Sequence, residues 1–532
     1  MDEQKHKDLV RFNQLFTKQD LLTDTWIDNE KLYNAKFTEE QLSKLKKKKR
    51  SKLFVPAIRN TTNIIKAIFT TAFFANGNPV EMIPVGEDES TLWTDRNKVL
   101  NYYFNKLKPN KELSKAFLSA LLFKMGVVIT YWDKSKKKVI TTHIPVTDIA
   151  FDDECVNIDD VQEIAYRYYE SNRVIQQKIN NGYYNAKKPE KLLKKLYPEN
   201  INNNRRKTVK VIYIQNNDGR YGAKTFIDNV LVKDTTFENL PFQYGYALDK
   251  LPSVDTDIRK DEILCYGGDV VEILKELQQE INQKRNLKND IQEKILNPDV
   301  YVGDDAEVDP KALTYGAGKM IRVKGNISAI KERTVPSEYS LNADLSMLAG
   351  DMQSAIGVNS IQEGQTSASD RRSASALAVV NSNSSMRIEE MIMLIKETLF
   401  EHWAKTWTKI VFKNADDKVI NAITGKQYPF GKKGKRDDIE YDLRINFGMT
   451  LDKEKKINDL LGIYQMTSQN PNINPTIVEK LLKKILDLRI GDDTDLDDLY
   501  KQVETQQQEQ QENIEPTKDD IEKQNLINGA IS

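Results

Sequence analysis

The chain has 532 residues, of which 39% are hydrophobic and 30% are charged. This length allows several domains. The low apolar content predicts a helix-rich protein whose helix surfaces are exposed to solvent or face other copies of the chain. Its 79 Lys and Arg balance its 79 Asp and Glu, which argues against a surface that grips nucleic acid tightly, because phosphate neutralisation needs a basic excess.

The first 255 residues predict a mixed α/β domain. Apolar residues at helical spacing indicate helices, and β-branched or aromatic runs indicate strands. The turn Asn217-Asp218-Gly219 predicts a hairpin. The expected helices are 7–50, 61–74, one or two within 91–125, and short ones within 171–196. The expected strands are 126–132, 139–144, 161–170, 209–215 and 221–232, with a loop over 145–160.

The middle of the chain is dominated by long, polar helices. We expect helices over 269–296, 341–356 and 373–412, the first stopped by Asn297-Pro298 and the last kinked at 381–385. Short strands are expected at 300–302 and 320–323. Residues 360–372 hold a single aliphatic side chain larger than Ala, which predicts a flexible polar loop.

The last part combines one strand with helices and a polar tail. Alternation predicts a strand over 441–447, and two helices are expected over 453–466 and 475–488. From Thr505 the chain is rich in Gln and Glu, which predicts a disordered or conditionally helical tail.

The sequence holds no catalytic, metal-binding or cofactor-binding pattern. His6, His143 and His402 lie far apart and share no ligand spacing with the two cysteines. The stretch Tyr315–Lys319 lacks the first Gly and the final Ser or Thr of a phosphate loop. We therefore expect a protein that is not an enzyme and uses no cofactor. Two cysteines and the absence of a long apolar run favour a soluble, intracellular chain.

The polar loop over 360–372 exceeds the usual length of a helix connector, which favours a functional role. Hydroxyl, amide and guanidinium groups can contact a DNA backbone without reading its sequence. The candidate DNA-contacting residues are Gln362, Gln365, Thr366, Ser367, Arg371 and Arg372.

Four segments, in their order and spacing, resemble the portal proteins of tailed bacteriophages, particularly those of short-tailed phages. The segments are Ser51–Arg59 (SKLFVPAIR) with the helix after it; Ala120–Asp133 (ALLFKMGVVITYWD) leading to Ile144–Asp148 and Phe151-Asp152; Met352–Asn359 (MQSAIGVN); and the Ser/Ala-rich stretch Ser369–Asn381. The resemblance extends over roughly residues 50–490.

The resemblance implies an α+β, helix-rich portal fold, with wing, stem, clip and crown, assembled as a dodecameric ring. The implied parts are the wing (1–255), first stem helix (256–297), clip (298–340), second stem helix (341–357), tunnel loop (358–372), long kinked helix with the wing remainder (373–449), crown (450–500) and a C-terminal tail (501–532). The candidate stem and channel-wall residues are Lys284, Lys288, Glu293 and Lys294. The candidate clip contacts are Asp304, Asp305, Glu307 and Lys311.

The resemblance also implies a function and partners. A portal ring sits at one capsid vertex, and double-stranded DNA is packaged and later ejected through it. The implied partners are other copies of the chain, double-stranded DNA, terminase, major capsid and scaffolding proteins, and tail or head–tail adaptor proteins. The chain would be made in the bacterial cytoplasm, would act in the virion, and would contact no membrane.

Two other functions remain open at this stage. A head–tail adaptor or minor capsid protein would have no channel of its own, although adaptors are usually much shorter than 532 residues. An enzyme subunit of the packaging motor would hydrolyse nucleotides, which the missing phosphate loop argues against.

Overall fold

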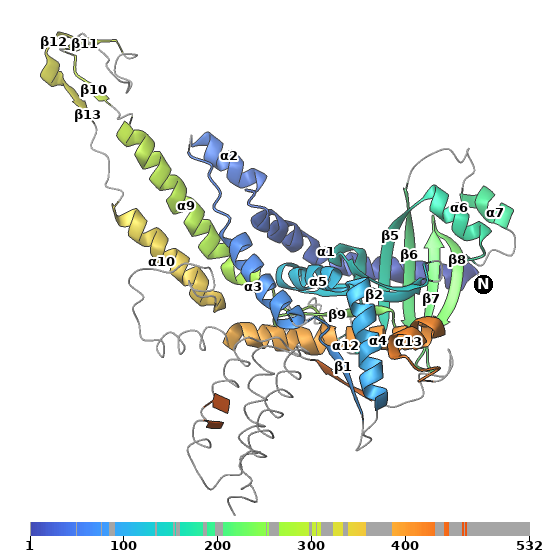
Figure 1. Ribbon diagram of the computed structural model, residues 1–532. Coiled ribbons are helices and arrows are strands. Elements are labelled where there is room, and N and C mark those ends of the chain that lie inside the picture. The colour runs from blue at the N-terminus through green and yellow to red at the C-terminus, as the bar shows by residue number, and fades with distance from the viewer. Residues whose placement is uncertain are drawn as a thin grey trace, which may run out of the picture. The chain divides into compact units, whose positions relative to one another are not determined.

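A computed structural model describes most of the chain up to residue 445 (Figure 1). Contacts divide the chain into two compact units, Met1–Phe447 and Gly448–Ser532. In the second unit only residues 460–461 and 463–464 are described, and they are helical. The described residues are 2–48, 50–75, 77–84, 91–133, 136–152, 155, 160–184, 189–196, 206–251, 253–254, 265–296, 300–304, 306–309, 323–332, 339–357, 386–430, 441–445, 460–461 and 463–464.

The helix predicted over 7–50 is two helices, α1 (Asp2–Tyr33) and α2 (Glu39–Lys47). The break comes at Ala35, whose φ of 55° is incompatible with a continuing right-handed helix. The second helix begins at a capping box, in which Thr38 and Gln41 each bond the other's backbone N–H. The break therefore has a local cause that apolar spacing does not reveal.

Three further helices and a small sheet follow α2, largely as predicted. They are α3 (Ala57–Phe74), α4 (Thr91–Leu107), α5 (Asn110–Phe123), β2 (Gly126–Asp133), β3 (Lys138–Ile144) and β9 (Phe242–Gly245). The strands lie in the order β3-β2-β9, with antiparallel neighbours. The third strand was not predicted, because four residues are too short to show alternation.

A five-stranded antiparallel sheet forms the second part of the α/β domain. Its order is β4-β5-β6-β7-β8. The expected strand over 221–232 is in fact two strands, because Asp228 and Asn229 both have positive φ and form a tight turn. The strands are β4 (Ile149–Phe151), β5 (Glu163–Ser171), β6 (Arg206–Gln215), β7 (Tyr221–Ile227) and β8 (Val230–Phe237). Next to the sheet are α6 (Asn172–Asn180) and α7 (Pro189–Leu196).

Alternation along these strands gives the sheet two apolar faces. On one face Ala165, Ile212 and Phe226 pack against Phe12 and Leu15 of α1. The other face joins the larger core, whose members include Ile164, Val209, Val211 and Ile227 together with Trp26 of α1. Successive strand residues point to opposite faces, so one sequence serves both cores.

The long helix near the end of the first unit is interrupted by a π-helical turn. Residues 386–395 are helical, the turn η4 covers Lys396–Phe400, and α12 covers Glu401–Asn414. The predicted kink at 381–385 lies outside the described residues. Trp403 and Trp407 of α12 are buried, and the Trp403 Nε1 donates to Thr141 Oγ1 at 3.2 Å. The long helix is thereby anchored on β3.

Two elements near the end of the first unit contact elements near its beginning. The strand β14 (Tyr441–Ile445) pairs antiparallel with β1 (Val80–Pro84), and α13 (Asp417–Thr424) contacts α4. Alternation predicted β14 correctly. Its partner, more than 350 residues earlier, is decided by the tertiary fold.

The half-buried His143 on β3 makes the stability of this unit pH-dependent. Burial lowers its pKa to about 4 from an ordinary 6.5, outweighing the nearby Glu112 carboxylate, while the Lys115 ammonium lowers it further. Its neutral form therefore stabilises the fold above pH 6.5, and this contribution is lost as the pH falls toward 4. Between pH 7 and 5 we expect a loss of about 2 kcal/mol in the free energy of unfolding.

A His143→Gln variant should lose that much less of its unfolding free energy over the same pH interval. Urea unfolding at pH 7 and pH 5 measures the difference between variant and parent. His6→Gln, at an exposed position on α1, is the control and should follow the parent. Parallel pH profiles for parent and His143→Gln would contradict the prediction.

Candidate functional site

The joint between the α/β domain and the long helix α9 (Val270–Leu296) is built on a row of polar side chains. Gln278, Asn282, Asn286 and Asp290 are spaced four residues apart, which places them on one face of the helix. Along this face lies the extended segment 51–56 before α3. We call these four side chains the polar ladder.

Each member of the polar ladder accepts a hydrogen bond from a backbone N–H, three of them in the extended segment and one, from Ile58, in the first turn of α3. The acceptor–donor pairs are Gln278 Oε1 with Ile58 N (3.0 Å), Asn282 Oδ1 with Val55 N (2.9 Å), Asn286 Oδ1 with Leu53 N (2.7 Å) and Asp290 Oδ1 with Ser51 N (2.8 Å). The alternation of Ser51, Leu53 and Val55 matches the two-residue period of an extended chain.

Two of the amide members also donate to the segment's carbonyl oxygens. Gln278 Nε2 donates to Val55 O at 2.7 Å, and Asn286 Nδ2 donates to Leu53 O at 2.9 Å. An amide offers both a donor and an acceptor, so one side chain can satisfy both backbone groups of a residue. The side chains thus do what a neighbouring strand would do for an extended segment, and α9 is polar here for that reason.

The last member of the polar ladder is charged. Burial alone would raise the pKa of Asp290, but hydrogen bonds from Ser51 and the Arg50 guanidinium hold it below its ordinary value. Arg50 Nη1 lies 3.1 Å from Asp290 Oδ2. The ion pair therefore closes the end of the ladder where the segment enters.

A buried ion pair holds the start of α9. Asp269 caps the helix, accepting from Glu272 N at 2.7 Å, and its side chain is fully buried. Burial raises the pKa of Asp269, while that hydrogen bond and the Lys124 ammonium oppose the rise. Lys124 Nζ lies 3.6 Å from Asp269 Oδ2 and 3.2 Å from Glu272 Oε2. Lys124 follows α5, so this contact ties the α/β domain to the helix.

The second predicted stem helix, α10 (Tyr339–Ile356), packs beside α9. Lys284 Nζ lies 2.7 Å from Asp344 Oδ2, and Lys288 Nζ donates to Asn342 Oδ1 at 2.6 Å. Two of the four candidate channel-wall residues thus contact α10 of their own chain, while Glu293 and Lys294 are exposed. Their role as a channel wall stays a prediction.

The side of α9 opposite the polar ladder carries exposed apolar side chains. Ile273, Leu287 and Ile295 are 45%, 39% and 49% exposed, although they recur near one side of the helix. Lys284 and Lys288, which contact α10, lie on this same side at helical spacing, so the exposed apolar side chains flank the α10 contact.

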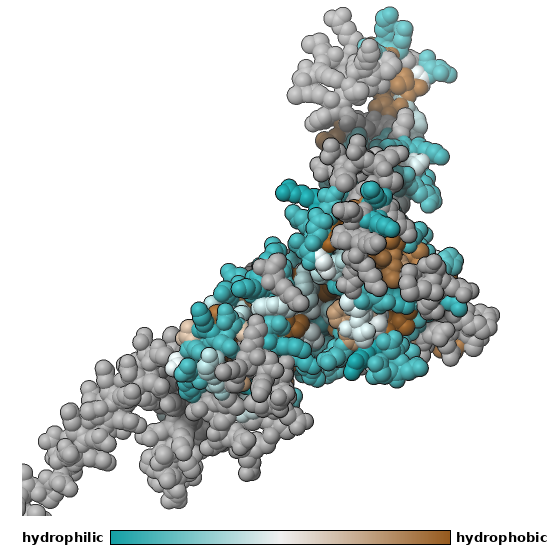
Figure 2. Space-filling view, turned by 90° about the vertical axis from the view of Figure 1, so that its right-hand side faces the viewer, coloured by the Kyte–Doolittle hydropathy of each residue, from teal (hydrophilic) through white to brown (hydrophobic). Residues whose placement is uncertain are grey.

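Residues 300–332 form two small hairpin-like pairs, as the predicted strand at 300–302 suggested. The pairs are β10 (Val300–Val302) with β13 (Ile330–Glu332), and β11 (Ala306–Val308) with β12 (Val323–Gly325). The second expected strand begins at Val323, and residues 320–322 lie outside the described residues. Tyr301 and Ile327 are 61% and 71% exposed, and brown apolar atoms lie at the top of Figure 2, where these pairs are.

The predicted clip contacts are described in part. Asp304 and Glu307 are exposed, and Glu307 pairs with Lys324 at 3.5 Å. Asp305 and Lys311 lie outside the described residues. So do the expected loop over 360–372 with all six candidate DNA-contacting residues, the helices over 453–466 and 475–488 except the four residues noted above, and the tail.

The described residues offer little chemistry beyond binding. No group of three or more His, Cys, Asp or Glu among them could hold a metal ion. Nor does any described helix have the length and apolar content that crossing a membrane requires. The site that the structure does display is structural: a helix pair, its joint to the α/β domain, and exposed hairpins.

Sequence reasoning predicted α9 and α10 but missed the polar ladder and Lys124. The ladder did leave a signal in the sequence, because an amide or carboxylate recurs every fourth residue from Gln278 to Asp290. A lysine after α5 leaves no such signal, since its partner Asp269 lies over 140 residues later.

Comparison with known proteins identifies the family. A family model described as the phage SU10 portal protein matches residues 16–224 and 266–527, which is most of the chain. No curated protein matches it. The matched stretches include the first three strands of the five-stranded sheet, the polar ladder, both hairpin pairs and the long helix. The chain therefore belongs to the phage SU10 portal protein family and is a structural portal component of a tailed phage.

Proposed function

We propose that twelve copies of the chain form a ring at one capsid vertex, and that double-stranded DNA is packaged and ejected through its axial channel. The observation that carries this proposal is the exposed apolar face of α9, defined by Ile273, Leu287 and Ile295. A closed ring of identical copies covers such a face on every subunit without leaving an open edge. Family membership supplies the portal context.

The charge balance supports a conduit. Equal numbers of basic and acidic residues give the chain no net charge. A strongly basic wall would release counterions from DNA and bind it tightly, whereas packaging requires DNA to slide. We propose that α9 and α10 form the stem, with Glu293 and Lys294 among the residues near the channel.

The exposed hairpin pairs over 300–332 are proposed as the clip, which docks terminase during packaging and tail or adaptor proteins afterwards. Their exposed Tyr301 and Ile327 supply apolar contact area, and Asp304 and Glu307 supply charge at the rim. The α/β domain is proposed as the wing, which faces capsid and scaffolding proteins. Synthesis would occur in the host cytoplasm and function in the virion.

Assembly state tests the ring directly. Native mass spectrometry of the purified chain, with scaffolding protein present where needed, should show a species near twelve times the 61.2 kDa subunit. Electron microscopy should show an axial hole. Monomers or dimers under all conditions would overturn the proposal, and a ring without a continuous hole would favour a head–tail adaptor.

Leu287→Glu should block ring assembly while leaving the subunit folded. The substitution places a charge in the exposed apolar face, where burial against a neighbouring copy would cost several kcal/mol. Sedimentation velocity should show a shift from rings to monomers, with unchanged circular dichroism. Leu21→Glu, at a 62% exposed position on α1, is the matched control and should still assemble. Rings of Leu287→Glu at parent yield would exclude α9 from the interface.

Arg371→Ala combined with Arg372→Ala should leave ring assembly intact and impair DNA packaging or retention. The two guanidinium groups would contact phosphates from the proposed tunnel loop, together with Gln362, Gln365, Thr366 and Ser367. The amount of DNA in purified heads measures the effect. Full-length genomes at the parent level would remove these arginines from the mechanism.

A further inference from the structure

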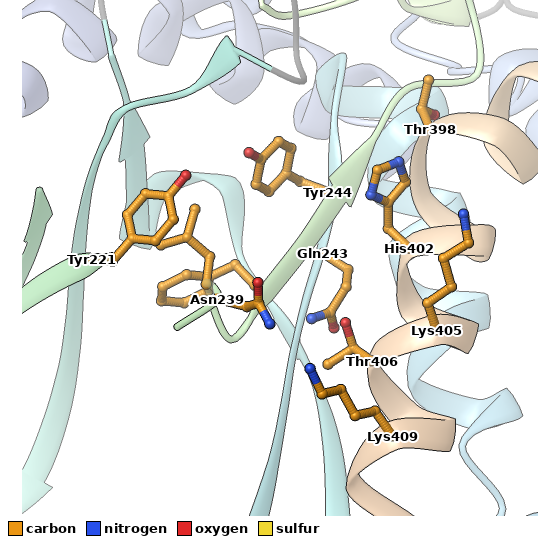
Figure 3. A pocket seen from close by; sticks show the side chains of 11 residues that line it. Tyr221, Asn239, Gln243, Tyr244, Thr398, His402, Lys405, Thr406 and Lys409 are labelled. Atoms are coloured by element: carbon orange, nitrogen blue, oxygen red, sulfur yellow. The ribbon is translucent and has the colours of Figure 1, made fainter. Parts of the chain in front are cut away.

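A cleft of about 430 Å³ lies between the edge strand β9 and the helix formed by η4 and α12 (Figure 3). This volume lies in the range of pockets that bind small ligands or short peptide segments. The strand belongs to residues 225–265, between the two stretches that the family model matches, whereas the helix side of the cleft lies within the second of them. None of the predicted portal parts uses it.

The lining of the cleft is cationic on its helix side. His402, Lys405 and Lys409 recur at helical spacing along α12 and line it together. None of the eleven lining residues, all of them described, carries a carboxylate. Figure 3 shows the Lys409 side chain extending from α12 toward Gln243 and Asn239. A ligand in the cleft would therefore meet positive charge that no lining residue neutralises.

A buried amide on the strand side is incompletely satisfied. Gln243 is 2% exposed, and its Nε2 donates to Pro241 O at 3.2 Å. Its Oε1 is buried and has no hydrogen-bond partner. The amide group is directed toward Thr406 and Lys409 in Figure 3. A buried polar atom without a partner is costly, so a ligand with an N–H donor would be stabilised there.

Strand β9 and the helix touch beside the cleft, at Gly245 and Thr398. An added Cβ at Gly245 would lie 2.3 Å from Thr398 Oγ1, so strand and helix touch there. Thr398 Oγ1 also accepts from Tyr246 N at 3.3 Å. Thr398 belongs to the π-helical turn η4, a distortion that often marks functional positions in helices.

We propose that this cleft binds an acidic peptide segment of a protein partner. Carboxylates of the segment pair with Lys405 and Lys409, and a backbone N–H donates to Gln243 Oε1. A peptide supplies carboxylate and N–H donor together, whereas the phosphate of a nucleic acid backbone supplies no donor. The edge strand β9 offers the extended surface on which such segments lie. The proposal is independent of whether the chain forms a ring.

The test uses the full chain and a fluorescein-labelled peptide of alternating Glu and Ala, with a Gln and Ala peptide of equal length as its uncharged match. Fluorescence anisotropy should show binding of the Glu peptide that weakens with salt. Lys405→Gln with Lys409→Gln should raise the Kd by about tenfold or more, since hydrogen bonds to charged groups contribute 1.5–3 kcal/mol. Lys413→Gln, one turn further along α12 and outside the lining, is the matched control.

A second variant separates binding from folding. Gln243→Leu should weaken binding of the Glu peptide with little change in the thermal midpoint, because Oε1 is unsatisfied in the free protein and Pro241 O, which loses the bond from Nε2, still accepts from Thr130 N. The proposal is overturned if the Glu peptide does not bind the parent, or if it binds the double lysine variant as tightly as the parent. Displacement of the peptide by an oligonucleotide or nucleotide that binds more tightly at Lys405 and Lys409 would assign the cleft to phosphate instead.

Discussion

Replacing Lys124 by Met should lower the free energy of unfolding of the Met1–Phe447 unit by about 3–5 kcal/mol. The change removes the ammonium group that lies 3.6 Å from Oδ2 of Asp269, whose side chain is fully buried at the start of α9. Breaking a buried ion pair from one side leaves an uncompensated charge, and effects of this size follow. Lys and Met have similar length, so packing changes little, and the positive φ of 69° at this position is unchanged.

Urea unfolding, followed by tryptophan fluorescence, measures this loss. Lys115→Met is the matched control, because Lys115 pairs with Glu112 at an exposed site and should cost under about 1 kcal/mol. Adding Asp269→Asn to Lys124→Met should recover much of the loss, since Asn keeps the helix cap without the charge. Equal effects of the Lys124 and Lys115 substitutions would contradict the assignment of this pair as the joint.

The same variant should show a diagnostic pH dependence. Burial already raises the pKa of Asp269, and loss of Lys124 removes a cause that opposes the rise. A raised carboxyl pKa in the folded state means that the folded state takes up this proton more readily than the unfolded state. The penalty of Lys124→Met should therefore shrink as the pH falls toward that raised pKa.

Gln278→Met should release the extended segment from α9. Gln278 is fully buried, accepts from Ile58 N and donates to Val55 O, so its loss leaves one buried and one partly buried backbone group without these partners. Each unsatisfied group costs about 1–3 kcal/mol. A local loss of about 3 kcal/mol corresponds to a roughly hundredfold increase in opening.

Hydrogen exchange followed by mass spectrometry measures that opening in peptides covering residues 51–58. Gln283→Met, an exposed amide on the same helix, should leave exchange there unchanged. Peptides from the five-stranded sheet should exchange alike in both variants, because the sheet does not contact the polar ladder. Unchanged protection of residues 51–58 in Gln278→Met would show that the segment is held by other contacts.

Local patterns predicted most elements that are long and periodic. The apolar spacing of α9 placed it within one residue, and the hairpin around Asn217-Asp218-Gly219 was correct. The pattern failed where a single residue decides the backbone. Ala35 breaks the first helix, and the Asp228-Asn229 turn divides one expected strand in two. Short elements such as β4, β9 and α13 were missed because three to eight residues carry too little periodicity.

The candidate site likewise contains parts that local sequence patterns predict and parts that they do not. The helix pair and the strand at 300–302 could be predicted, because both rest on local patterns in the sequence. The polar ladder could not be assigned, because a row of amides on a helix is equally consistent with a solvated face. Only its partner, the extended segment about 230 residues earlier, shows that these amides are buried and bonded.

The sequence by itself determined the portal family, the order of its elements and the absence of an obvious catalytic pattern, because these depend on residue types and their spacing along the chain. The tertiary structure alone decided how the long helix is joined to the α/β domain, which face of it remains exposed, and that β9 and α12 enclose a cationic cleft. Each of these depends on residues that are distant in sequence. Burial and hydrogen-bond satisfaction, which follow from such contacts, distinguish a polar side chain that binds backbone from one that faces water.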